Sequence, residues 1–86
     1  MTAQQAKEIL KKKYPTGTIS NHYFFINGRY YSGITFRQIP KEVKLHFPDR
    51  SFLGVSVDSN DGIIEDFSSF DLCEICKPFE KDVKNW

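Results

Sequence analysis

The sequence has no apolar run close to the roughly 20 residues that a membrane-spanning helix needs. Its first 14 residues are polar and lack the apolar core and small-residue cleavage site of a signal peptide. It contains only two cysteines, whereas small secreted folds are commonly rich in disulfides. We therefore expect a cytoplasmic protein with reduced thiols and no membrane association.

Catalytic motifs are also missing. There is no P-loop, dinucleotide fingerprint, nucleophile elbow or HExxH pair. The chain has two histidines, His22 and His46, and nothing in the sequence places a carboxylate or hydroxyl within reach of either. We expect a protein that is not an enzyme and needs no cofactor.

Two motifs suggest a metal, but neither is complete. Cys73 and Cys76 form a CxxC pair, which is half of a zinc site, and both histidines precede it at a spacing unlike that of zinc fingers. The run 58–62 is rich in Asp and Asn but lacks the Gly and Glu that an EF-hand loop requires at its sixth and twelfth positions. We interpret the first as two ordinary thiols, with metal binding or redox activity less favoured, and the second as a turn.

The chain is rich in aromatic residues. Its 86 residues include eight Phe, four Tyr and one Trp, enough large side chains for one packed domain over residues 1–86. Residues 1–50 carry a net charge of +6 and residues 51–86 a net charge of −5. We expect the two halves to pack together and neutralise each other, and an anion-binding face is the alternative.

A helix followed by a hairpin is the clearest local pattern. Thr2 and Gln5 form a capping box, an apolar stripe follows, and Pro15 ends the pattern, which predicts a helix over 2–14. Asn27-Gly28 is typical of a two-residue type I′ turn and predicts a hairpin of strands 18–26 and 29–37.

The turn predicts the pairs 25/30, 23/32, 21/34 and 19/36, and with them two faces of the hairpin. One face is expected to lie in the core: Ile19, Asn21, Tyr23, Phe25, Tyr30, Ser32, Ile34 and Phe36. The other is expected to face outward: Ser20, His22, Phe24, Ile26, Arg29, Tyr31, Gly33 and Thr35.

Alternating apolar residues predict further strands around 43–47, 53–57 and 63–67. Pro40 at a helix N1 position leaves a short helix near residue 40 as a less favoured alternative to the first of these strands. Because Pro78 would interrupt a helix that began near Asp71, we predict a short C-terminal helix over 78–85, with Phe79, Val83 and Trp86 facing the core. The predicted fold is α+β: an N-terminal helix on a four-stranded antiparallel sheet of two hairpins, with a short C-terminal helix or tail.

The outward hairpin face has the aromatic and basic composition of interface anchors. We predict a binding site made by five residues: His22, Phe24, Arg29, Tyr31 and Arg37. The leading hypothesis is a protein-binding module of inhibitor, immunity or adaptor type, whose partner is another protein. The alternative is single-stranded nucleic-acid binding by the same face, and a small enzyme or an acidic nucleic-acid mimic is less favoured. The chain is expected to be a monomer or an edge-strand homodimer.

Overall fold

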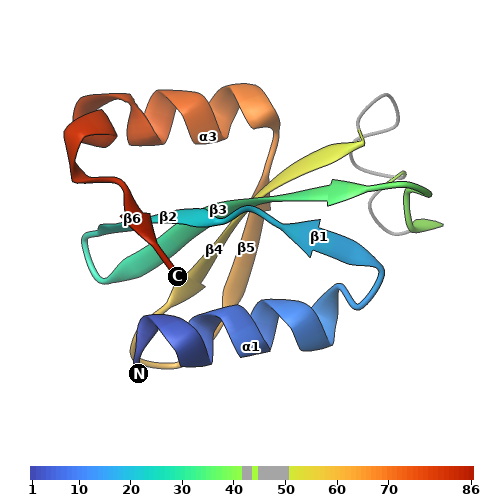
Figure 1. Ribbon diagram of the computed structural model, residues 1–86, viewed down its shortest axis with the longest axis horizontal. Helices are drawn as coiled ribbons and strands as arrows, with labels where there is room; N and C mark the ends of the chain where they lie inside the picture. Colours follow the sequence, from blue (N-terminus) through green and yellow to red (C-terminus); the bar gives the residue numbers. More distant parts are fainter. Residues whose placement is uncertain (42–43, 45–50) are drawn as a thin grey trace.

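Two helices lie on opposite faces of an antiparallel sheet in the computed structural model, which describes residues 1–41, 44 and 51–86 (Figure 1). The sheet order is β5-β4-β3-β2-β6, and β1 also pairs with β3. The strands are β1 (Gly17–Ile19), β2 (His22–Ile26), β3 (Arg29–Phe36), β4 (Phe52–Asp58), β5 (Ile64–Phe67) and β6 (Lys84–Asn85). The α+β class is confirmed, and the sheet has more strands than the four predicted.

The N-terminal helix α1 (Ala3–Lys13) forms as predicted. The Thr2 hydroxyl accepts a hydrogen bond from the Gln5 amide (3.2 Å), and the Gln5 side-chain oxygen accepts one from the Thr2 amide (2.8 Å). These reciprocal bonds satisfy two amides that a helix start would otherwise leave unpaired. Leu10, on the apolar stripe, is fully buried against the sheet.

The hairpin of β2 and β3 turns at Asn27 and Gly28, whose φ angles are 49° and 78°. Ile26 pairs with Arg29 directly across this turn, so the loop has the two residues that the sequence predicted. Positive φ at both central positions is what Asn-Gly supplies in a type I′ turn.

The first strand of the hairpin is interrupted, which corrects the predicted pairs 21/34 and 19/36. Ile19 pairs with Ile34, so β1 is shifted by two residues relative to the register of β2. Ser20 and Asn21 lie between the two strands, and their carbonyls accept hydrogen bonds from the indole N–H (2.7 Å) and the amide (3.3 Å) of Trp86. A shift of two residues leaves the side chains of β1 on their predicted faces, whereas Asn21, predicted to lie in the core, is exposed.

The core lies between α1 and the sheet. It contains Ala6, Leu10, Tyr14, Tyr30, Ile34, Phe36, Leu53, Val55 and Val57. Phe25, predicted to be in this core, has 48% of its surface exposed. The reason is its place near the edge of the sheet: β6 pairs with His22 and Tyr23 and does not extend to Phe25.

The C-terminal segment differs from the predicted helix over 78–85. Helix α3 (Ser69–Cys76) is capped by the Ser68 hydroxyl, which accepts from the Asp71 amide (3.1 Å). The 3-10 helix η1 (Lys77–Asp82) follows, because Pro78 has no amide to continue the α-helical bonding.

The chain then enters β6. Val83 is exposed rather than in the core, whereas Trp86 packs against the core as predicted.

The remaining strands have mixed outcomes. The strands predicted over 53–57 and 63–67 are confirmed as β4 and β5. The strand predicted over 43–47 lies outside the described residues, although Lys44 donates its amide to the Pro40 carbonyl (2.9 Å), a helix-type bond. No helix in the described part of the chain is long and apolar enough to cross a membrane.

One glycine lets α3 approach the sheet, and its partner on the next strand leaves room for an aromatic ring. Gly33 on β3 pairs with Gly54 on β4, on the face that α3 covers. A Cβ at Gly54 would lie 2.8 Å from the Cβ of Leu72 on α3, closer than real Cβ atoms approach, and a Cβ at Gly33 would overlap the ring of Phe52. These two positions therefore require glycine for lack of space.

We predict that Gly54→Ala lowers the free energy of unfolding by about 1–3 kcal/mol, because the added methyl group overpacks the contact with Leu72. Urea unfolding measures this. In a Leu72→Gly background the same substitution should cost clearly less, because the Cβ that the added methyl group would meet is then absent. An equal cost in both backgrounds would contradict the proposed clash.

Candidate binding groove beside the C-terminal helix

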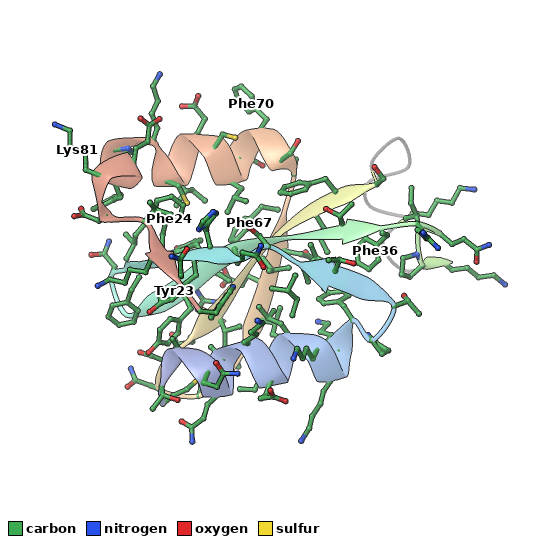
Figure 2. The ribbon with its side chains drawn as sticks, viewed as in Figure 1. Tyr23, Phe24, Phe36, Phe67, Phe70 and Lys81 are labelled. Atoms are coloured by element: carbon green, nitrogen blue, oxygen red, sulfur yellow. The ribbon has the colours of Figure 1, made fainter. Side chains whose placement is uncertain are left out.

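A groove runs between β2 and the C-terminal helical segment. It encloses a hollow of about 230 Å³ lined by Phe24, Leu72, Cys73, Cys76, Lys77 and Glu80. Figure 2 shows Phe24 pointing from the sheet towards this segment, on the side opposite to Tyr23. The lining is mostly apolar, with one positive and one negative side chain, so the groove suits an apolar group with a polar neighbour.

Helix α3 exposes apolar surface as well as burying it. Leu72 and Cys76 face the sheet, and Cys76 is the buried residue of the helix. Phe70, two residues before Leu72, points away from the sheet with 65% of its surface exposed (Figure 2). Helix α1 differs, because its exposed positions carry Gln, Glu and Lys. The exposed positions of α3 therefore carry one large aromatic ring among Asp71, Cys73 and Glu74.

One of the five predicted site residues lines this groove, and a second lies two residues along the same strand. Phe24 forms part of its wall. His22 is exposed, two residues along the same strand and on the same face, and its Nδ1 lies 2.6 Å from Oδ1 of Asn85. Asn85 belongs to β6, so this bond ties the imidazole to the strand that covers the edge of β2.

Arg29 faces the same side of the sheet, but its donors are used within the chain. Its Nε donates to the Ser56 hydroxyl (2.9 Å), and Nη2 donates to the carbonyl of Ile63 (3.1 Å). Nη1 lies 3.3 Å from Oδ2 of Asp58 in a partly buried ion pair. Arg29 therefore joins β3 to β4 and to the turn before β5.

Tyr31 and Arg37 lie apart from the groove. Tyr31 pairs with Phe24 across the hairpin and stacks on Phe67 of β5, with ring centroids 6.0 Å apart. Arg37 follows the end of β3 and is exposed near Thr16 and Pro40, a part of the molecule that the groove does not include. The structure thus brings together His22, Phe24, Arg29 and Tyr31 on one face and leaves Arg37 outside.

The two oppositely charged halves share few ion pairs in the described residues. Arg29 with Asp58 joins the halves, and Lys11 with Glu8 lies within α1 (3.9 Å). The four lysines of α1 lie on one side of the sheet, and the acidic residues of α3 lie on the other. Among the described residues, one ion pair therefore joins the two halves.

The turn 58–62 is held by its own side chains, in agreement with the predicted turn. Asp58 Oδ1 accepts from the amides of Asn60 (2.8 Å) and Asp61 (3.3 Å), and Gly62 has a φ of 74°. The pKa of Asp58 lies below its usual value. The hydrogen bond from the Asn60 amide lowers this pKa most, partial burial raises it, and the Asp61 amide and the charge of Arg29 lower it further.

The two thiols are unpaired and differ in exposure. Cys73 is exposed in the groove wall, and Cys76 is buried. Burial, followed by the neighbouring Cys73, raises the pKa of Cys76 to about 11, so this thiol stays protonated at neutral pH. Within the described residues no three His, Cys, Asp or Glu side chains gather as metal ligands do, and His46 lies outside them.

Sequence reasoning missed Phe70, the most exposed large apolar side chain of α3. A signal for it was present, because residues 70 and 72 are about 200° apart around a helix. If Leu72, Ile75 and Cys76 face the sheet, Phe70 must face outward. Comparison with protein-family models, with curated protein sequences and with solved structures finds no significant match to this chain.

We predict that Asp58 stabilises the fold at neutral pH and loses this effect in acid. Because its pKa is lowered in the folded chain, its contribution is present above its unfolded pKa and is lost as the pH falls below about 4. Asp58→Asn should therefore have a lower free energy of unfolding than the native chain at neutral pH, and this difference should shrink towards about pH 3. Urea unfolding over that pH range tests the prediction. A difference in unfolding free energy that stays constant with pH would contradict it.

We also predict that the two thiols differ in reactivity. At pH 8 a thiol with a pKa of about 11 is ionised in only about one molecule in a thousand. Iodoacetamide should therefore modify Cys73 of the folded chain and leave Cys76 intact until urea is added. Intact-mass measurement of Cys73→Ser and Cys76→Ser variants separates the two sites. Rapid modification of the folded Cys73→Ser variant would show that Cys76 is accessible.

Proposed function

We propose that this chain is a small, non-enzymatic protein-binding module of inhibitor, immunity or adaptor type. In this proposal the partner contacts one surface, made by the outer side of α3, by η1 and by the Phe24 side of β2; we name it the α3 surface. The observation that best supports it is the exposed ring of Phe70, which points away from the sheet on the outer side of α3.

The α3 surface has the composition of a contact region. Interface centres are enriched in aromatic residues and are ringed by polar ones. Here Phe70 and Phe24 supply two rings, and Lys77 and Glu80 stand at the groove. Full burial of a phenylalanine side chain contributes about 1.5–3 kcal/mol, so these two rings supply part of the free energy that association requires.

The predicted site residues take different roles in this proposal. Phe24 and His22 contact the partner. Arg29 and Tyr31 support the surface from behind, because the former joins β3 to β4 and the latter packs between Phe24 and Phe67. Arg37 is left outside it.

Charge favours a protein over a nucleic acid on this surface. Residues 69–82 carry four acidic side chains and two basic ones. A net negative surface repels phosphates, whereas a protein partner can supply complementary charge. Single-stranded nucleic-acid binding stays the alternative, and the salt dependence of binding separates the two.

The experiment is affinity capture from the source organism with the full chain, with and without nuclease, followed by affinity measurements on the protein identified. Phe24→Ala with Phe70→Ala should weaken binding at least tenfold, because anchor residues each contribute more than about 1 kcal/mol. Phe25→Ala is the matched control, since Phe25 is exposed on the other face of the same hairpin.

Three results would contradict the proposal. One is undiminished binding by the double variant when circular dichroism shows that it is folded. Another is an equal loss in the Phe25 control. The third is capture that disappears with nuclease and an affinity that falls steeply with salt, which would favour the nucleic-acid alternative.

A further inference from the structure

Strand β5 forms one edge of the sheet. It pairs with β4 on one side, and no described strand pairs with it on the other. Alternate backbone N–H and C=O groups on an outer edge point away from the sheet, where another strand can bond to them. The opposite edge is different, because β6 is only two residues long.

The two middle residues of β5 are acidic and exposed. Glu65 pairs with Ser56 and so projects to the α3 side, whereas Asp66 pairs with the buried Val55 and projects to the α1 side. A strand added along this edge would place a side chain beside each carboxylate. Like charges opposite each other destabilise a strand pair, and opposite charges stabilise it. A second copy of β5 is therefore disfavoured, and a basic segment is favoured.

A hollow lies near this edge on the α1 side. It has a volume of about 360 Å³ and is lined by Met1, Gln5, Glu8, Ile9 and Lys12 of the N-terminal segment. A Cβ placed on Gly62, just before β5, would lie 3.3 Å from Cδ1 of Ile9 and 3.4 Å from Cε of Met1, so the turn and the hollow are adjacent. Figure 1 shows this turn passing beside the N-terminal end of α1.

Exposed apolar side chains stand at the hollow and directly before the strand. Ile63, directly before β5, is 59% exposed, and Met1 is also exposed. Strand addition takes its affinity from backbone bonds and its specificity from pockets for alternate side chains. The edge of β5 offers unpaired backbone groups, and the hollow offers one pocket beside the turn that precedes the strand.

We infer that β5 accepts an extended segment of a partner protein by strand addition. The segment carries alternating basic and apolar residues: its basic side chains lie beside Glu65 on the α3 side, and an apolar side chain enters the hollow at Met1 and Ile9. Asp66, on the α1 side, adds attraction for positive charge. This edge is separate from the α3 surface and does not depend on the function proposed for it.

The probe is a short synthetic peptide of alternating lysine and valine, added to the full chain. Amide hydrogen exchange of residues 64–67, followed by NMR, should slow about tenfold in the complex, because the outward amides become bonded. A peptide of alternating glutamate and valine should not bind. A peptide of alternating lysine and serine should bind more weakly, because it has no apolar side chain for the hollow.

Matched charge reversals locate the site. Glu65→Lys should weaken the lysine–valine peptide about five- to tenfold. Glu74→Lys makes the same charge change on the exposed side of α3 and should have little effect. The Phe24→Ala, Phe70→Ala double variant should bind the peptide normally, so failure at one surface is distinguishable from failure at the other.

Three outcomes would overturn this inference. Equal weakening by Glu65→Lys and Glu74→Lys would show attraction by overall charge alone. Peptide binding without slower exchange at 64–67 would place the peptide elsewhere. A homodimer of the native chain, detected by sedimentation and protecting the same amides, would show that a second copy occupies this edge.

Discussion

The position of α3 depends on the absence of a side chain at Gly54. Leu72 of α3 lies directly over this residue of β4, and an added Cβ would be 2.8 Å from the Cβ of Leu72. The neighbouring Gly33 on β3 leaves room for the ring of Phe52 instead. With a larger residue at position 54, α3 would have to stand further from the sheet or shift along it. The separation of α3 from the sheet, which Leu72 and Cys76 of the groove share, thus depends on a glycine that does not line the groove.

Arg29 determines how the strands meet at the other end of the sheet. Its guanidinium reaches Ser56 and Ile63, and the Ser59 amide donates to the Gly28 carbonyl (2.9 Å), so the two turns are bonded to each other. Ser56 is fully buried, and its hydroxyl is bonded to Arg29. An arginine that looks like an interface anchor in the sequence is therefore part of the internal polar network. It holds β5 and the turn before it in place, and with them the acidic edge.

Local patterns in the sequence predicted the local structure, but they did not predict contacts between residues far apart in the chain. The capping box at Thr2 and the turn at Asn27-Gly28 need only neighbouring residues, and both formed as predicted. The interruption at Ser20 involves Trp86, which is 66 positions away in the sequence and gives no local signal. The helix starting at Ser69 was obscured by Pro78, which ends α3 rather than preventing it. Coverage of the outer hairpin face by α3 likewise depends on tertiary packing. The composition of that face alone could therefore not show which of its residues are accessible to a partner.

The two helices divide the molecule into unlike sides. Helix α1 buries its apolar stripe and presents lysines to solvent, so its outer side is satisfied by water. Helix α3 keeps an exposed ring on its outer side and acidic residues around it, and β5 adds an acidic edge next to it in the sequence. Both proposed contacts therefore combine acidic residues of the second half of the chain with apolar residues of the first, Phe24 in one and Met1 with Ile9 in the other. A partner with a basic, partly apolar surface is attracted by the acidic residues, whereas the lysines of α1 repel it. The charge separation along the sequence thus orients the partner on the molecule, in addition to any effect on affinity.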